Sequence, residues 1–109
     1  MMTFVMLTRI APGAMRSPRE LEALERDVVN RIRAECPESD WLHSFAVLWP
    51  YDYLDVFQVP NIETATKIST LVRTYGHATT EMWPAVGWAH FKDIIRVLTP
   101  LEPVVEGMP

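Results

Sequence analysis

The chain has 109 residues, of which 49% are apolar and 22% charged, and its net charge is −4 at pH 7. This length and composition predict one domain with a hydrophobic core and exclude global disorder. The acidic balance argues against a nucleic-acid binder, which normally carries a basic face, and a single cysteine excludes an intramolecular disulfide framework.

The first half of the chain predicts a strand, a helix and a second strand. Thr3 to Ile10 alternates and is rich in apolar residues, which is typical of a strand. The helix begins after Ser17, whose side chain can accept a hydrogen bond from an amide of the first turn, and a proline follows at the first helical position. Its apolar residues recur at steps of three and four until Pro37 ends it. Trp41 to Trp49 is the second predicted strand.

The second half predicts a hairpin, a helix and a fourth strand. Pro50 to Asp52 is a tight connection to a third strand, Tyr53 to Val59, so the second and third strands form a hairpin. Asn61 to Tyr75 is a helix that begins with a capping side chain, and Gly76 can supply its left-handed stop. His77 to Trp83 is the fourth strand.

These elements predict an α+β fold. A short C-terminal helix follows the fourth strand, with the apolar residues Trp88, Phe91, Ile95 and Leu98. The order β-α-β-β-α-β is that of the ferredoxin-like unit, an antiparallel sheet with two helices on one face. We therefore predict a single domain over residues 1–99, and an extended tail over the proline-rich residues 100–109.

Alternation along the strands assigns side chains to two sheet faces. One face is aliphatic and suits packing under two helices; it comprises Val5, Leu7, Leu42, Ala46, Leu48, Leu54, Val56, Ala78 and Met82. The other face is more aromatic and carries ionisable groups; it comprises Phe4, Met6, Trp41, Phe45, Val47, Trp49, Tyr53, Phe57 and Trp83, with His43, Asp55, His77, Thr79 and Glu81.

We expect a second copy of the chain to cover this aromatic face. Left in water, its side chains would exceed the roughly 300–600 Å² apolar patch that is usual on a monomer. A face-to-face homodimer around a twofold axis would bury them. The alternative is a monomer whose C-terminal helix folds over the face.

A motif runs through the predicted hairpin and the fourth strand. The hairpin reads WPYDYLDVF over residues 49–57, Ala65 follows, and the fourth strand begins GHATTE over residues 76–81. With these segments the chain resembles the GYD-domain family, with Pro50 where the family's naming glycine would be. The resemblance covers about residues 3 to 95. It implies a dimeric α/β barrel, in which two ferredoxin-like units join their sheets, and it implies no particular chemistry.

The candidate pocket residues share the aromatic face by strand parity. They are His43, Asp55, His77, Glu81 and Trp83. Ionisable groups among aromatic side chains must pair, become neutral or meet a ligand. Because the second and fourth strands lie at opposite edges of the predicted sheet, the two histidines can meet only across a dimer. They would then form structural pairs with carboxylates, or a ligand pocket in which Asp55 or Glu81 is a candidate general base.

Other candidates have simpler structural explanations. Tyr51 and Asp52 could transfer protons, but aspartate organises turns, so we interpret the pair as a structural turn motif. Cys36 follows a helix, whose negative end disfavours a thiolate, and we reject it as a nucleophile. A two-histidine, one-carboxylate metal site is an alternative for His43 and His77, but no compact ligand motif supports it. The glycines form no phosphate-binding loop, so we predict neither a metal nor a cofactor.

Two functional hypotheses follow. The first is a non-catalytic homodimer that binds a small, partly apolar molecule or serves as a subunit. The second is a cofactor-independent enzyme of monooxygenase or isomerase type, a role that similar dimeric barrels can have, with a His/carboxylate pocket. No apolar run reaches the ~20 residues of a membrane span. The N-terminal segment lacks a basic region and a cleavage site, so we expect a cytoplasmic protein without nucleic-acid or membrane partners.

Overall fold

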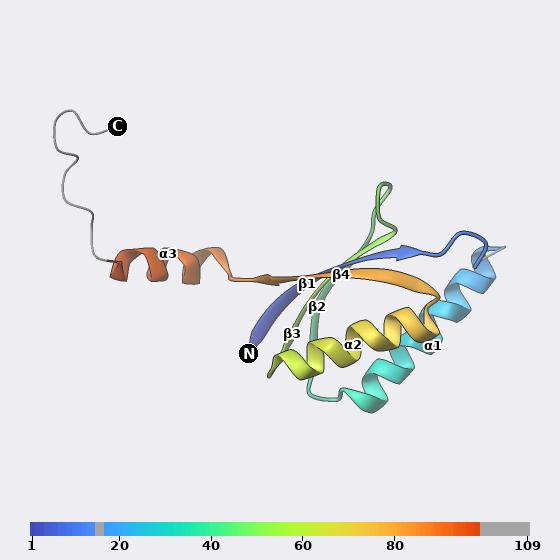
Figure 1. The fold of residues 1–109 in the computed structure, drawn as a ribbon, viewed down its shortest axis with the longest axis horizontal. Coiled ribbons are helices and arrows are strands. Elements are labelled where there is room, and N and C mark those ends of the chain that lie inside the picture. The colour runs from blue at the N-terminus through green and yellow to red at the C-terminus, as the bar shows by residue number, and fades with distance from the viewer. Residues whose placement is uncertain (15–16, 99–109) are drawn as a thin grey trace.

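The structure is a computed structural model that describes residues 1–14 and 17–98 (Figure 1). In chain order its elements are β1 (Met2–Ile10), α1 (Pro18–Glu35), β2 (Asp40–Ala46), β3 (Tyr53–Val59), α2 (Ile62–Tyr75), β4 (Ala78–Ala85) and α3 (Trp88–Val97). The strands form one antiparallel sheet in the order β2-β3-β1-β4. The α+β class is confirmed, and the tail predicted for 100–109 lies outside the described residues.

Both long helices begin at the predicted capping residues. The Ser17 hydroxyl accepts a hydrogen bond from the Glu20 amide at 3.2 Å, and a proline occupies the first turn of α1. The Asn61 side chain accepts from the Thr64 amide at 2.9 Å and starts α2 in the same way. Each bond satisfies an amide that has no partner within its helix.

The end of α2 differs from the prediction. Gly76 has φ −89°, and the following residue, His77, takes the left-handed conformation with φ 48°. Gly76 is required for another reason: a Cβ there would overlap the Val72 carbonyl oxygen. The His77 carbonyl accepts a hydrogen bond from the Ala11 amide at 2.8 Å, which ties this turn to the end of β1.

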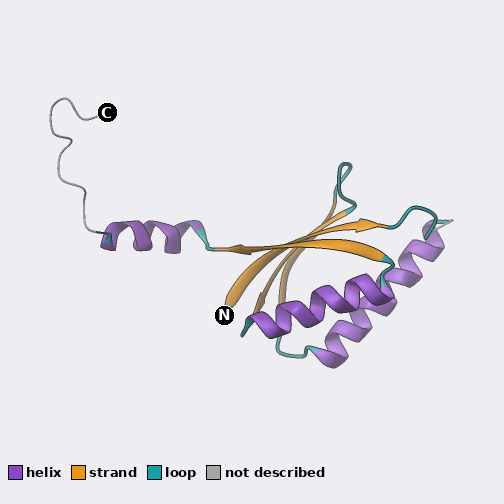
Figure 2. Cartoon of the chain, viewed as in Figure 1, coloured by secondary structure: helices purple, strands orange, loops and turns teal. Residues whose placement is uncertain are grey.

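Two layers make up the body of the molecule. Helices α1 and α2 cover one face of the sheet, and none of the described helices lies over the other face (Figure 2). α2 packs on β4 and β3, whereas α1 packs mainly on α2. The buried core between these layers consists of Phe4, Met6, Ile32, Cys36, Phe57, Val59, Ala65, Ile68, Leu71 and Val72. Trp41 stacks on Phe57 at the edge of this core, with ring centroids 4.6 Å apart.

The predicted assignment of side chains to faces is wrong for β1 and β3. Phe4, Met6 and Phe57, expected on the open face, are buried under the helices. Both faces of these central strands are apolar, so alternation separates two sets of side chains without saying which set the helices cover. The larger side chains, Phe4, Met6 and Phe57, fill the space between the sheet and the helices. Pairing places the smaller aliphatic set on the open face; it comprises Val5, Leu7, Leu54 and Val56.

A bulge in β2 also changes the faces. The pairing of β2 with β3 shifts between Trp41 and His43, so one extra residue interrupts the alternation. Trp41 therefore faces the helices, while His43 and Phe45 face the open side as predicted. The strand ends at Ala46 rather than Trp49, and a longer loop leads into β3.

Helix α3 does not cover the open face. It continues from the end of β4 away from the sheet and the other helices (Figure 1), and none of its residues is buried. The predicted alternative, in which the C-terminal helix folds over the open face, is therefore wrong as to the position of this helix. None of the described helices has the length and apolar character needed to cross a membrane.

Candidate functional site

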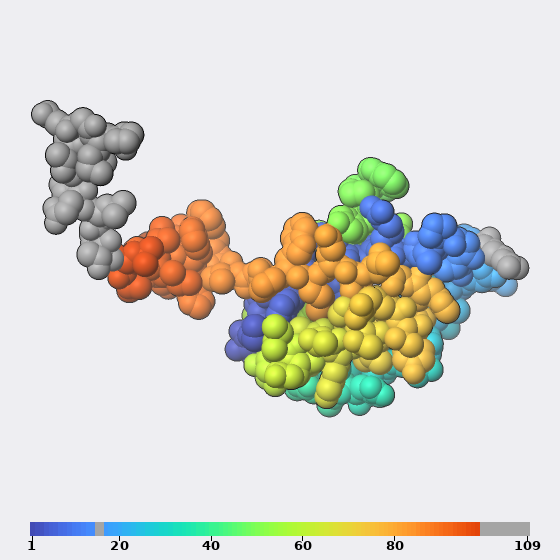
Figure 3. Space-filling view, viewed as in Figure 1, coloured from blue at the N-terminus to red at the C-terminus, as the bar shows by residue number. Residues whose placement is uncertain are grey.

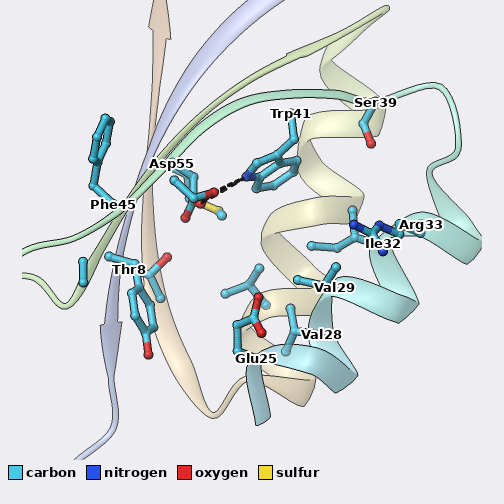
Figure 4. Close-up of a pocket in the computed structure, with 15 residues that line it drawn as sticks. Thr8, Glu25, Val28, Val29, Ile32, Arg33, Ser39, Trp41, Phe45 and Asp55 are labelled. Atoms are coloured by element: carbon cyan, nitrogen blue, oxygen red, sulfur yellow. Dashed lines mark hydrogen bonds between the residues drawn. The ribbon is translucent and has the colours of Figure 1, made fainter. Parts of the chain in front are cut away.

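A cavity of about 640 Å³ lies between α1 and the sheet (Figure 4). The end of α1 reaches the core through Ile32, but its middle turns stand away from β1 and β3, because the helix rests on α2. Val28 and Val29 of α1 form one wall, Trp41 forms part of the opposite wall, and Met6 of β1 is a further lining residue. This volume falls within the roughly 300–1,000 Å³ of small-molecule sites.

Asp55 supplies a carboxylate to the sheet side of this cavity. Its Oδ1 accepts hydrogen bonds from the Ser44 hydroxyl at 2.7 Å and from the Trp41 indole N–H at 3.1 Å. The same indole N–H also lies 2.9 Å from the Ser44 oxygen, so the three side chains are all hydrogen-bonded to one another. Within residues 1–14 and 17–98, no hydrogen bond reaches the other oxygen, Oδ2.

The surroundings of Asp55 raise the pKa of its carboxyl group. Burial raises the pKa of this carboxyl above its ordinary value of 3.8, and the bonds from Ser44 and Trp41 oppose the rise. A lowered dielectric disfavours the charge, whereas donors stabilise it. The three ion pairs among the described residues all lie on exposed helix surfaces and do not involve Asp55. The carboxyl is thus held in place without a cationic partner there.

Thr8 adds a second polar group to the cavity. Its side chain is only 4% exposed, and its hydroxyl has no hydrogen-bond partner among the described residues. On β1 it pairs with Tyr53 of β3, so it lies diagonally across from Asp55 on the same face. An unpaired buried hydroxyl is unfavourable by about 1–3 kcal/mol, so this position is suited to an external acceptor.

Further polar residues border the cavity. Glu25 and Arg33, both on α1, are largely exposed and lie across from the sheet (Figure 4). Tyr53 lines the wall beside Thr8, and burial, with smaller contributions from neighbouring carboxylates, raises the pKa of its phenol. The cavity therefore combines apolar walls with a polar end on β1, β2 and β3.

Only one of the predicted pocket residues lines this cavity, and it is Asp55. His43 lies on the open face, where its ring is 6.0 Å from that of Phe45. Glu81 and Trp83 lie on the open face of β4, at the opposite edge of the sheet. His77 is exposed in the turn before β4. The prediction that these groups share a face fails for Asp55, because β3 presents its odd-numbered residues to the helices.

The Tyr51–Asp52 motif forms structural contacts. The Asp52 carboxylate accepts a hydrogen bond from the Ile10 amide at 2.7 Å, and the Asp52 amide donates to the Thr8 carbonyl at 2.8 Å. Together they fix the hairpin loop to the end of β1. The Tyr51 hydroxyl hydrogen-bonds to Glu81, and this bond raises the pKa of the phenol.

Sequence reasoning missed Thr8, Ser44 and the indole of Trp41 as parts of the polar end. For Thr8 there is a signal: it continues the series Phe4 and Met6 at steps of two, and a polar residue in an apolar series marks a special position. Ser44 and Trp41 meet Asp55 only because of the bulge in β2.

Nucleophilic chemistry at Cys36 and metal binding find little support among the described residues. Burial raises the pKa of the Cys36 thiol, with smaller effects from neighbouring charges, and so disfavours the nucleophilic thiolate. In the part of the chain that the structure describes, no three His, Cys, Asp or Glu side chains are grouped so that they could hold a metal ion.

Comparison with known proteins identifies the fold family of the chain. The GYD domain family model matches residues 4–95, which confirms the resemblance seen in the hairpin and fourth strand. A search of curated proteins finds no match to the sequence.

Proposed function

This chain belongs to the GYD-domain family, and we propose that it binds a small, largely apolar molecule in the cavity between α1 and the sheet. The observation that carries this proposal is the cavity of about 640 Å³ with Asp55 at its polar end. Small-molecule sites combine such apolar walls with a few fixed polar groups that orient the ligand.

The arrangement around Asp55 supports binding over simple packing. Protein interiors are close-packed and contain few voids larger than a water molecule. A carboxyl group in partly apolar surroundings is unfavourable unless other groups satisfy it. Trp41 and Ser44 satisfy one of its oxygens, and a ligand in the cavity would satisfy the other.

A fluorescent probe and a filled cavity test this function. N-phenyl-1-naphthylamine, a neutral molecule, becomes fluorescent in apolar surroundings, and we expect the wild-type protein to enhance its emission. Val29→Trp places an indole in the cavity and should abolish the enhancement. Ala34→Trp adds the same bulk to α1 at an exposed position outside the cavity and should leave it unchanged. Equal enhancement by both variants would contradict the proposed site.

We propose in addition that two such ferredoxin-like units pair through their open faces as a homodimeric α/β barrel. Large apolar side chains on this side support the proposal: Phe45 is 55% exposed and Trp83 is 51% exposed. Phe57, expected to join them, is fully buried in the core and cannot contribute. A second copy would cover the remaining aromatic surface.

Catalysis without a cofactor is the second candidate function. The raised pKa of Asp55 and its free Oδ2 favour a role in proton transfer. His43 and His77 do not line the cavity, so Asp55 alone supports this candidate. An enzyme of this kind would lose turnover in Asp55→Asn while the variant still bound the probe; a binding protein would show no turnover in either form.

A further inference from the structure

We infer that Thr8 and Asp55 together recognise one uncharged group that both accepts and donates a hydrogen bond, a hydroxyl, on an otherwise apolar ligand. This inference rests on the proposed function, because it specifies which molecules the cavity accepts. It assigns a role to two polar groups that otherwise leave hydrogen-bonding capacity unused in the described structure.

Thr8 provides the donor. Its hydroxyl is buried and has no partner among the described residues, although Thr64, which is equally buried, bonds through its hydroxyl to Glu38 and Asn61. Thr8 lines the cavity while its hydroxyl oxygen is closed to solvent, so the side chain must rotate about χ1 for the hydroxyl to donate to a ligand oxygen there. An acceptor on the ligand would remove the penalty of the unpaired hydroxyl.

Asp55 provides the acceptor. Trp41 and Ser44 both donate to Oδ1, so the carboxylate is held in one orientation with Oδ2 left for the ligand. The network lies on the sheet side of the cavity, across from Val28 and Val29 of α1 (Figure 4). An O–H of the ligand can donate to Oδ2.

Strand register puts the two groups within reach of a single functional group. Met6 pairs with Asp55 and Thr8 pairs with Tyr53, so Thr8 and Asp55 are diagonal neighbours on one face of β1 and β3. Diagonal neighbours of this kind lie roughly 7–8 Å apart across the two strands, a gap that one ligand oxygen between the two side chains can bridge. One hydroxyl oxygen can therefore accept from Thr8 and donate to Asp55.

The charges around the cavity narrow the ligand further. A carboxylate or phosphate would be repelled by Asp55, and the cationic lining residue Arg33 lies on the opposite wall. An ammonium group could donate to Asp55 but would leave the Thr8 proton without an acceptor. An uncharged hydroxyl satisfies both groups.

Ligands of matched shape test this assignment. We would measure the affinities of p-cresol, p-xylene and 4-methylanisole from the shift of the Trp41 indole N–H resonance. The wild-type protein is expected to bind p-cresol about tenfold more tightly than p-xylene, as two hydrogen bonds of ordinary strength would give. Thr8→Val should reduce this preference about threefold, whereas Thr64→Val, a change at an equally buried threonine outside the cavity, should not alter it.

Asp55→Asn should change which ligand the cavity prefers, rather than merely weaken its preference for p-cresol. With its oxygen kept on the Trp41 and Ser44 donors, asparagine presents its NH₂ group to the cavity. The variant should then favour 4-methylanisole, which only accepts, relative to the wild-type protein. A purely structural role for Asp55 would not produce this exchange.

The outcomes separate the two proposals. If none of these ligands binds the wild-type protein, the proposed function fails. If p-xylene and p-cresol bind equally, or if their ratio is unchanged in Thr8→Val and Asp55→Asn, the cavity binds ligands but the hydroxyl assignment is overturned. Tighter binding of 4-methylbenzylamine than of p-cresol would also overturn it, because the recognised group would then be a cation.

Discussion

Two threonines with equal burial have opposite surroundings. Thr8 and Thr64 are each 4% exposed. The hydroxyl of Thr8 has no partner in the described structure, whereas that of Thr64 lies 2.8 Å from Asn61 and 3.0 Å from Glu38. The contributions of these two hydroxyl groups to the free energy of unfolding should therefore differ in sign.

Replacing each threonine by valine, which has nearly the same shape, tests this difference. Without ligand, Thr8→Val should raise the free energy of unfolding by about 1 kcal/mol, because it removes an unpaired buried hydroxyl. Thr64→Val should lower it by about 1 kcal/mol, because it breaks satisfied bonds at the start of α2. Urea denaturation measures both. A loss of stability in Thr8→Val would mean that its hydroxyl is already paired.

The raised pKa of Asp55 predicts a pH dependence of stability. The folded protein holds the Asp55 proton more tightly than the unfolded chain, whose pKa is near the ordinary value of 3.8. The stabilisation from this proton is fully present below that value and is lost as pH rises through the raised folded pKa. Asp55→Asn does not titrate, so the wild-type protein should lose stability relative to this variant as pH rises through that window.

Urea unfolding of both proteins from about pH 4 to about pH 8 measures the effect. Ser44→Ala gives a second comparison, because it removes a hydrogen bond that lowers the pKa of Asp55. In this variant the pH-dependent window should extend to higher pH. Parallel stability curves for wild type and Asp55→Asn would show that Asp55 titrates normally.

The residues that sequence predicts well are those whose role depends on near neighbours. Ser17 and Asn61 cap their helices as predicted, because the bonds reach only three residues ahead. The face of Trp41 could not be predicted, because it depends on a bulge that the pattern of β2 does not reveal. The polar end of the cavity depends on that bulge, which explains why Asp55 was found and its partners were not.

At the scale of elements, the loop between β2 and β3 is hydrogen-bonded to a third strand, β1. The Asp52 side chain and main chain both bond to the end of β1, through the Ile10 amide and the Thr8 carbonyl. The sequence predicted a turn residue at this position, and the structure shows that its bonds reach another strand. A local pattern could not reveal this because the partners are more than 40 residues away.

Removing the Asp52 carboxylate should loosen this connection. Asp52→Ala leaves the Ile10 amide without its acceptor and should lower the free energy of unfolding by about 1–3 kcal/mol. Asp52→Asn retains an oxygen that can accept the bond and should lose less. Chemical denaturation gives the energies, and amide exchange at Ile10 should quicken in the alanine variant alone. Equal exchange rates in both variants would argue against this bond.

At the scale of the whole molecule, no described residues of the same chain cover α3 or the open sheet face. Figure 3 shows α3 as a protrusion separate from the body, and Trp88 and Phe91 on it are exposed. The sequence predicted the helix correctly from its apolar spacing. Its position could not be predicted, because spacing shows which face of a helix is apolar but not what packs against it.

We expect the protein to be a dimer at micromolar concentration, measured by light scattering after size-exclusion chromatography. Trp83→Ser should shift the equilibrium towards monomer, because it removes a large apolar side chain from the open face. Ile62→Ser, a change at a similarly exposed position on α2, should leave the dimer intact. A wild-type monomer, or dissociation by both variants, would contradict pairing through the open face.

The way α1 rests on α2 has a consequence for how the binding site can diversify. The groups proposed to recognise a hydroxyl, Thr8 and Asp55, lie on the two central strands of the sheet, which are hydrogen-bonded on both sides. The wall formed by Val28 and Val29 belongs to a helix that packs chiefly on its neighbour. Substitutions in this wall can enlarge or reduce the cavity while the strands keep the polar end in place. Ligand size and ligand chemistry can thus evolve separately in this fold, one through the helix and the other through the sheet.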